Sequence, residues 1–140
     1  MTQRMGIMQT KEIVIMTQQD KDLLLRDLSA RLPYGVKAIR YIERNNKVEQ
    51  LIPELNLSFR LVELFISNHE FIVKPYLRPI SSMTKDEEKE YNKTLCVIHG
   101  HGSFSTIDTF DYLLSHHFDV HDLIPKGLAI AITDNNNPYK

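Results

Sequence analysis

The chain has 140 residues, of which 42% are hydrophobic and 25% charged, and its formal net charge is −1. This ordinary globular composition excludes an intrinsically disordered chain, and a domain of this size buries roughly two-thirds of its unfolded surface. The apolar runs are only a few residues long, far short of the roughly 20 residues that a membrane-spanning helix needs. The near-neutral charge and the lack of a dense basic patch argue against a nucleic-acid partner.

The first residues and the cysteine content predict a cytoplasmic protein. Residues 1–16 contain no continuous apolar block and no small-residue cleavage site of the kind that secretory signals carry. Cys96 is the sole cysteine, so a disulfide within the chain is excluded, in agreement with a reducing compartment. We therefore expect a buried thiol at Cys96 and no membrane partner.

The clearest helix signal lies at residues 17–32. Thr17 and Asp20 have the spacing of a capping box whose second member is Asp in place of the preferred Glu. On the outer face, the i,i+4 spacing is expected to pair Asp27 with Arg31. Four leucines fall on the face that we expect to be buried: Leu24, Leu25, Leu28 and Leu32.

Residues 36–77 change to a strand pattern, because β-branched and aromatic residues are frequent and apolar residues recur at every second position. The alternation is cleanest over residues 55–61 and slips by one residue at Leu61-Val62, which predicts a bulge. Residues suited to tight turns separate the segments. We predict a small antiparallel meander of four strands, at residues 36–43, 47–52, 55–66 and 71–77.

The segment KPYLRP at residues 74–79 is predicted to be ordered and packed. Its two prolines, Pro75 and Pro79, restrict their own backbones and favour an extended conformation at an edge or in a packed loop. Its apolar side chains then hold the segment against the rest of the domain. The prolines are therefore not interpreted as a boundary between domains.

A pair of helices is predicted after this segment. Thr84 and Glu87 form a capping box ahead of an acidic first turn, which predicts a helix at residues 85–98 that contains Cys96. A second helix is expected at residues 106–117. Its inward-facing residues are predicted to be Ile107, Phe110 and Leu114.

These elements together predict an α+β fold. An N-terminal helix and a C-terminal helical pair are expected to cover a small antiparallel four-stranded sheet that is twisted or partly closed. We assign residues 16–133 to a single domain, with a short final strand at residues 128–132. Residues 134–140 are interpreted as a loose tail.

Three separated blocks resemble a family of short uncharacterised proteins from gut bacteria and their phages. The blocks are residues 17–32 with the PYGV that follows, KPYLRPISSMT at 74–84 and HHFDVHDLIPKGLAI at 116–130. The family has no assigned activity, so the resemblance implies no catalytic or binding residue. Its members begin with methionine directly before the first block, which implies that residues 1–15 are an N-terminal extension, although residues 13–15 could equally add a strand.

Histidine is the sharpest chemical feature of the sequence, because five of the six histidines lie between residues 99 and 121. Imidazole and carboxylate groups together are a ligand set for zinc or another first-row metal. The spacing matches no established zinc signature, and adjacent side chains on a helix point about 100° apart, so exposed or packing roles are the alternative. The candidate metal ligands are His99, His101, His116, His117, His121 and Asp119.

No motif for catalysis or cofactor binding is present. The sequence lacks GxSxG, the P-loop, GxGxxG and HExxH, so we predict no catalytic residue and no cofactor, and we favour a protein that is not an enzyme. RLPYG and KPYLRP bring together residue types common at partner surfaces, although such residues also fill packed turns. The candidate partner-surface residues are Tyr34, Tyr76 and Arg78.

The leading hypothesis from the sequence is a non-enzymatic accessory or adaptor protein of a bacterial or phage element that acts through protein contacts. The alternative is a metal-binding protein or metal-dependent enzyme that uses the histidines between His99 and His121. The two hypotheses differ in whether metal stabilises the fold.

Overall fold

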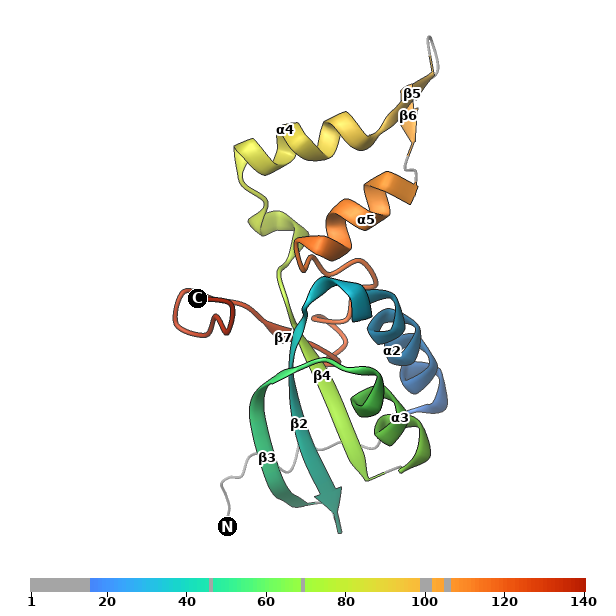
Figure 1. The fold of residues 1–140 in the computed structure, drawn as a ribbon, viewed down its shortest axis with the longest axis vertical. Helices are drawn as coiled ribbons and strands as arrows, with labels where there is room; N and C mark the ends of the chain where they lie inside the picture. The colour runs from blue at the N-terminus through green and yellow to red at the C-terminus, as the bar shows by residue number, and fades with distance from the viewer. Residues whose placement is uncertain (1–15, 46, 69, 99–101, 105–106) are drawn as a thin grey trace.

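The computed structural model describes residues 16–45, 47–68, 70–98, 102–104 and 107–140. The N-terminal extension that the sequence assigns to residues 1–15 lies outside these residues. The class is α+β, as predicted (Figure 1). The elements are, in chain order, α2 (Gln18–Arg31), η1 (Leu32–Tyr34), β2 (Lys37–Arg44), β3 (Lys47–Asn56), α3 (Phe59–Ser67), β4 (Phe71–Leu77), η2 (Ile80–Ser82), α4 (Lys85–Thr94), β5 (Cys96–Ile98), β6 (Gly102–Phe104), α5 (Ile107–Ser115) and β7 (Ile130–Ala131).

The main sheet has the strand order β3-β2-β4-β7. β2 pairs antiparallel with both β3 and β4, whereas β7 pairs parallel with β4 through Tyr76 and Leu77. The sheet is therefore mixed, and the prediction of a purely antiparallel sheet is wrong in this detail. The C-terminal strand returns to the sheet after the helical pair, so it meets β4 in the parallel sense.

The predicted strand at residues 55–66 is wrong, because most of this segment is helix α3. β3 ends at Asn56, and the side chain of Ser58 caps α3 by accepting a hydrogen bond from the N–H of Leu61 at 3.2 Å. The buried residues Leu61, Val62 and Phe65 have helical spacing. The slip at Leu61-Val62 that suggested a bulge is the point where the period changes from two to 3.6.

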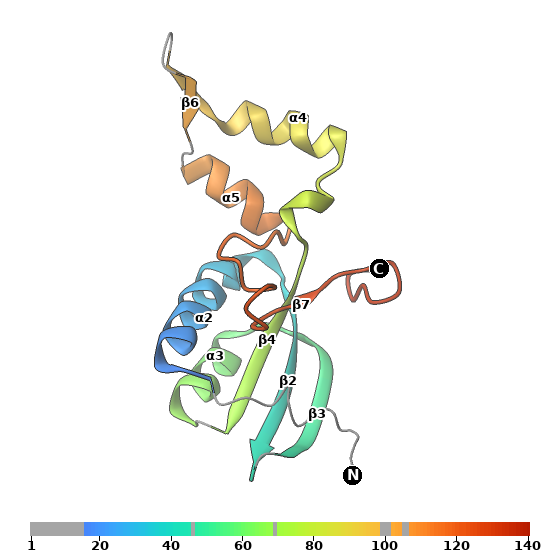
Figure 2. The same cartoon turned by 180° about the vertical axis from the view of Figure 1, so that it is seen from behind.

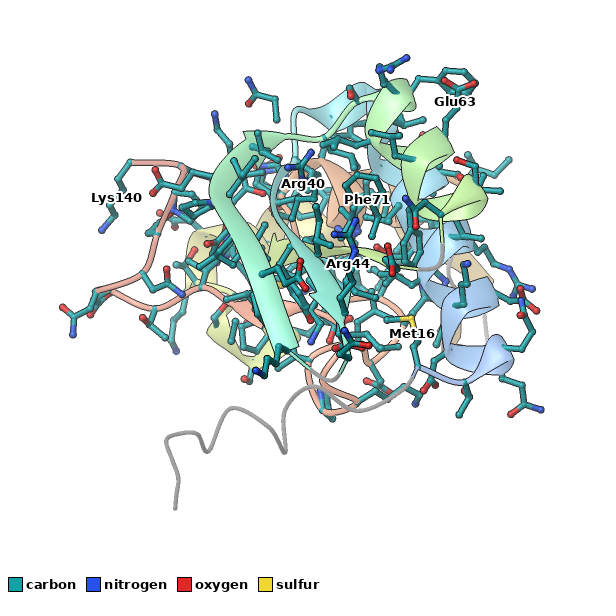
Figure 3. All side chains as sticks on the ribbon, turned by 90° about the horizontal axis from the view of Figure 1, so that it is seen from below. Met16, Arg40, Arg44, Glu63, Phe71 and Lys140 are labelled. Atoms are coloured by element: carbon teal, nitrogen blue, oxygen red, sulfur yellow. The ribbon has the colours of Figure 1, made fainter. Side chains whose placement is uncertain are left out.

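The core lies between the sheet and helices α2 and α3, which lie side by side over one face of the sheet (Figure 1). Leu24 and Leu28 are fully buried, as predicted, and Leu25 and Leu32 pack against the core while partly buried. At the lower end of this face, the guanidinium of Arg40 lies 5.1 Å from the ring centre of Phe71 (Figure 3). The other buried core residues include Val36, Ala38, Phe65, Val73, Leu77 and Leu123.

The predicted helical pair forms an arm, which we define as the described parts of residues 85–115. The arm extends away from the sheet, with the β5–β6 hairpin toward its tip (Figures 1 and 2). It does not cover the sheet, contrary to the prediction. α4 also ends at Thr94, earlier than predicted, so Cys96 begins a strand and is not in a helix. The β-branched pair Val97-Ile98 follows there, and such residues favour strands.

The inward face predicted for the second helix is only partly correct. Leu114 is buried, but Ile107 is 80% exposed and Phe110 is 39% exposed. The buried residues of α5 are instead Thr109, Leu113 and Leu114. Thr109 and Leu113 thus lie on the inward side of α5, which faces α4 and the body. We define the body as the main sheet with α2 and α3.

The segment KPYLRP is ordered and packed, as predicted: Pro75, Tyr76 and Leu77 are all buried in β4. In the segment at residues 134–140, for which the sequence predicts a loose tail, the hydroxyl of Tyr139 makes two hydrogen bonds to the backbone of Lys37 and Tyr76. None of the helices in the described parts of the chain has the length and apolar character to cross a bilayer.

Candidate functional site: the joint at the base of the arm

A fully buried ion pair lies on the inner face of α2. Arg31 Nε is 2.5 Å from Asp27 Oδ1 and Arg31 Nη2 is 3.1 Å from Asp27 Oδ2, and both side chains have 0% exposure. The sequence placed this pair on the outer face, which is wrong. Leu24, Asp27, Leu28 and Arg31 follow the i,i+3,i+4,i+7 spacing of one helix face, and this spacing is the signal that sequence reasoning missed.

This ion pair ties the loop after α5 to α2. Asp27 Oδ2 lies 2.8 Å from Nδ1 of His121, and Arg31 Nη2 donates to the backbone oxygen of Phe118 at 2.7 Å. Both charges therefore have partners from the loop as well as from each other, which buried charges require. The loop is held to the body by polar contacts that span about ninety residues of sequence.

Arg78, at the end of β4, joins this loop to the arm. Its guanidinium lies 4.3 Å from the ring centre of Phe118 and donates two hydrogen bonds of 2.7 Å to the carboxylate of Glu87 on α4. Its backbone N–H donates to His117 O at 2.7 Å, and its carbonyl accepts from Asp119 N at 2.8 Å. We define the joint as these linked residues: Asp27, Arg31, Arg78, Glu87, Phe118 and His121.

Glu87 fixes the start of α4 to the joint. Its side chain also accepts from the N–H of Thr84, which completes the predicted capping box. The hydrogen bond from Arg78, supported by those from Thr84, lowers the pKa of Glu87 to about 2. Glu87 therefore keeps its charge in all but strong acid.

The structure gives the candidate metal ligands within the described residues four separate sets of contacts. His116 stacks on Tyr112, with 4.1 Å between ring centres, and His117 stacks on Tyr139. His121 contacts Asp27, and Asp119 accepts hydrogen bonds from the N–H groups of two loop residues. Over the described ranges no group of three or more His, Cys, Asp or Glu has metal-binding geometry. His99 and His101 lie outside these ranges.

The candidate partner-surface residues all make contacts inside the chain. The hydroxyl of Tyr34 donates to Asp111 on α5 at 3.0 Å, Tyr76 is buried in β4, and Arg78 is in the joint. The main polar groups of Tyr34 and Arg78 are thus bonded inside the chain, and Tyr76 is buried. Over the residues whose burial is described, the exposed large apolar side chains lie elsewhere: Val48, Leu51, Phe59, Ile66, Ile80, Ile107 and Phe110.

The pair formed by Asp27 and His121 resembles the orienting pair of a hydrolase, in which a carboxylate holds an imidazole that activates a nucleophile. Here the same carboxylate also binds Arg31. Among the residues whose side chains the structure describes, no Ser or Thr is hydrogen-bonded to His121. The contact of His121 with Asp27 connects the loop after α5 to α2.

Comparisons with known proteins add no relative to this description. No protein-family model matches the chain, and neither the curated proteins nor the solved structures contain a significant match.

Proposed function

We propose that the chain is a non-enzymatic accessory or adaptor protein that acts through protein contacts, and that the arm carries its contact surface. α4 supports this proposal most directly, because none of its ten residues is buried. A helix that is polar nearly all round obtains little stability from a core. A partner that packs against such a projecting helix would supply the stabilising contacts that the chain itself does not.

Exposed apolar side chains on α5 support the same surface. Ile107 and Phe110 are three residues apart, which places them on one side of the helix. Their exposure leaves apolar surface of α5 in water. Exposed apolar side chains that lie together are a common mark of a protein interface.

The joint supports the proposal by holding the arm in one orientation. The bidentate contact between Arg78 and Glu87 fixes the start of α4, and Tyr34 with Asp111 fixes α5 to the body. Thr94 and Thr109 join the two helices to each other. A preorganised surface loses less conformational entropy on binding than a mobile one.

We further infer that this accessory protein belongs to a bacterial or phage element and acts in the cytoplasm. The three family-like blocks support the origin, and the single cysteine supports a reducing compartment. The composition favours a protein partner over a nucleic acid.

Co-purification with matched variants tests the proposal. Ile107→Glu combined with Phe110→Glu should reduce the captured partner at least about tenfold, because two apolar anchors become charged. Phe59→Glu is the control, since Phe59 is an exposed aromatic residue on α3, outside the arm. Equal capture by all three proteins would contradict the assignment of the arm.

A zinc titration separates the adaptor from the metal-binding alternative. Tight binding to the folded chain raises the melting midpoint by mass action. The proposed adaptor keeps the same midpoint with and without zinc. A melting midpoint that rises with zinc would instead favour the metal-binding protein, provided that the rise disappears in the double variant His99→Ala with His101→Ala.

A further inference from the structure

The C-terminal tail, defined as residues 133–140, is attached to the body through one aromatic side chain. Thr133 and Asn136 bond to each other's backbone in an exposed turn, and Asn137 Oδ1 accepts from the N–H of Tyr139 at 2.9 Å. Within the described residues, the hydrogen bonds from the tail to the body are those of the Tyr139 hydroxyl. The tail is thus hydrogen-bonded to the body through a single side chain.

The Tyr139 hydroxyl lies where strands β2 and β4 separate. It accepts from Lys37 N at 2.8 Å and donates to Tyr76 O at 3.1 Å. The β2–β4 ladder ends at Ala38 paired with Pro75, so Lys37 and Tyr76 are the next positions in the same register. The hydroxyl replaces the missing ladder contact between them.

At this point each strand is still paired along its other edge. Lys37 is paired with Asn56 of β3, and Tyr76 is paired with Ile130 of β7. Between the two strands, the N–H of Lys37 and the carbonyl of Tyr76 both face the Tyr139 hydroxyl. A phenol hydroxyl satisfies both, since it accepts and donates at once. A phenyl ring satisfies neither.

The ring of His117 contacts the face of the Tyr139 ring. Its ring stacks on Tyr139 with 4.0 Å between ring centres and an interplanar angle of 12°. The residue has φ 65°, and its backbone bonds to Leu114 and Arg78 hold it there. Its buried Nδ1 has no hydrogen-bond partner among the described residues, so stacking is the contact that the ring supplies.

Charge states agree with this geometry. Burial, with the nearby charges of Arg31, His116 and Arg78, lowers the pKa of His117 to about 4, so the ring is neutral near pH 7. Burial raises the pKa of Tyr139 to about 12, so the hydroxyl keeps the proton that it donates. The contact is between two neutral rings.

We propose that Lys37 N–H, Tyr76 C=O and the His117 ring form a binding site for a tyrosine side chain in a peptide. The chain's own tail occupies this site, and it acts as a displaceable strap. When the tail leaves, a tyrosine-bearing peptide takes its place. Specificity for tyrosine over phenylalanine comes from the two backbone groups, because a lost partner leaves a buried donor and acceptor unsatisfied.

The proposal is tested with full-length Tyr139→Ala, which empties the site. A synthetic peptide of residues 133–140 is titrated in, and the NMR signals of the Lys37 amide and the His117 ring are followed. We expect both signals to shift and saturate. The same peptide with phenylalanine in place of Tyr139 should bind at least about tenfold more weakly, because it lacks both hydrogen bonds.

Three outcomes would overturn the proposal. They are equal binding of the tyrosine and phenylalanine peptides, no saturable shift in the folded variant, and loss of folding in Tyr139→Ala, because a displaceable strap is not needed for the fold. A second measurement uses the parent chain with p-cresol, which should release the tail and make its amides mobile. A tail that stays ordered at saturating p-cresol would contradict the proposal.

Discussion

Asp27 and Arg31, one turn apart on α2, form an ion pair whose side chains are both fully buried. They also hold the loop after α5, through His121 and the backbone of Phe118. A charge that loses its partner in such a place is left unsolvated, which typically costs about 3–5 kcal/mol. The ion pair therefore helps to position the arm, because it holds the loop that follows α5.

Either half of this pair should be costly to remove alone. Asp27→Leu or Arg31→Met should each lower the free energy of unfolding by about 3–5 kcal/mol, and the double variant by less than the sum. Urea denaturation of the parent and the three variants forms a double-mutant cycle. Additive losses would show that the two charges act independently.

Leu28 is a central core residue, because it is fully buried between α2 and the sheet. Leu28→Ala should lower the free energy of unfolding by about 2–5 kcal/mol. Leu51→Ala is the matched control, since Leu51 is exposed on β3 and such changes stay within about 0.5 kcal/mol. Similar denaturation midpoints for the two variants would contradict the described core.

The hydrophobic pattern identified the elements that have a long, regular period. α2 and its Thr17 cap, the strands at residues 36–43 and 71–77, and the Thr84–Glu87 capping box were all predicted correctly. The segment at residues 55–66 failed because Leu61 and Val62 fit a strand with a bulge as well as a helix. In a short apolar segment, the strand period of two residues and the helix period of 3.6 residues cannot be told apart.

The joint could not be predicted in the same way. Phe118 is far from Arg78 and Glu87 in sequence, and only the return of the chain beside β4 brings it to Arg78. Ile107 and Phe110 have the spacing of a buried face. Their exposure follows from the direction in which the arm leaves the body. The local sequence pattern does not determine this direction.

The contact between Arg78 and Glu87 should stabilise the arm specifically. Glu87→Gln removes the charge-assisted pair and should cost about 1–2 kcal/mol, with faster hydrogen exchange in α4. Glu90→Gln is the control on the same helix, because the pair of Glu90 with Lys93 is highly exposed and such pairs contribute little. Equal exchange rates in both variants would contradict the role of the joint.

Stability should fall in mild acid because of His117. Its pKa is about 4 in the folded chain and 6.5 ordinarily, so between these values the unfolded state binds more protons. This contribution is complete above pH 6.5 and is lost as the pH falls toward 4. The contribution of Glu87, with a pKa lowered from 4.5 to about 2, is lost in the lower window.

Urea midpoints at about pH 7 and about pH 5 measure the His117 effect. His117→Asn should flatten the pH dependence in this range, and asparagine tolerates the positive φ of this position. Glu87→Gln should change the dependence only at lower pH. An unchanged slope in His117→Asn would assign the acid sensitivity to other groups.

The claim that the arm carries the contact surface is tested most directly by site-specific photo-crosslinking. A photoreactive residue is placed at Ile107 in one protein and at Phe59 of α3 in another, and each is irradiated in a bacterial lysate. We predict one discrete crosslinked species from position 107 and none from position 59. The same species from position 59, or none from position 107, would contradict the account.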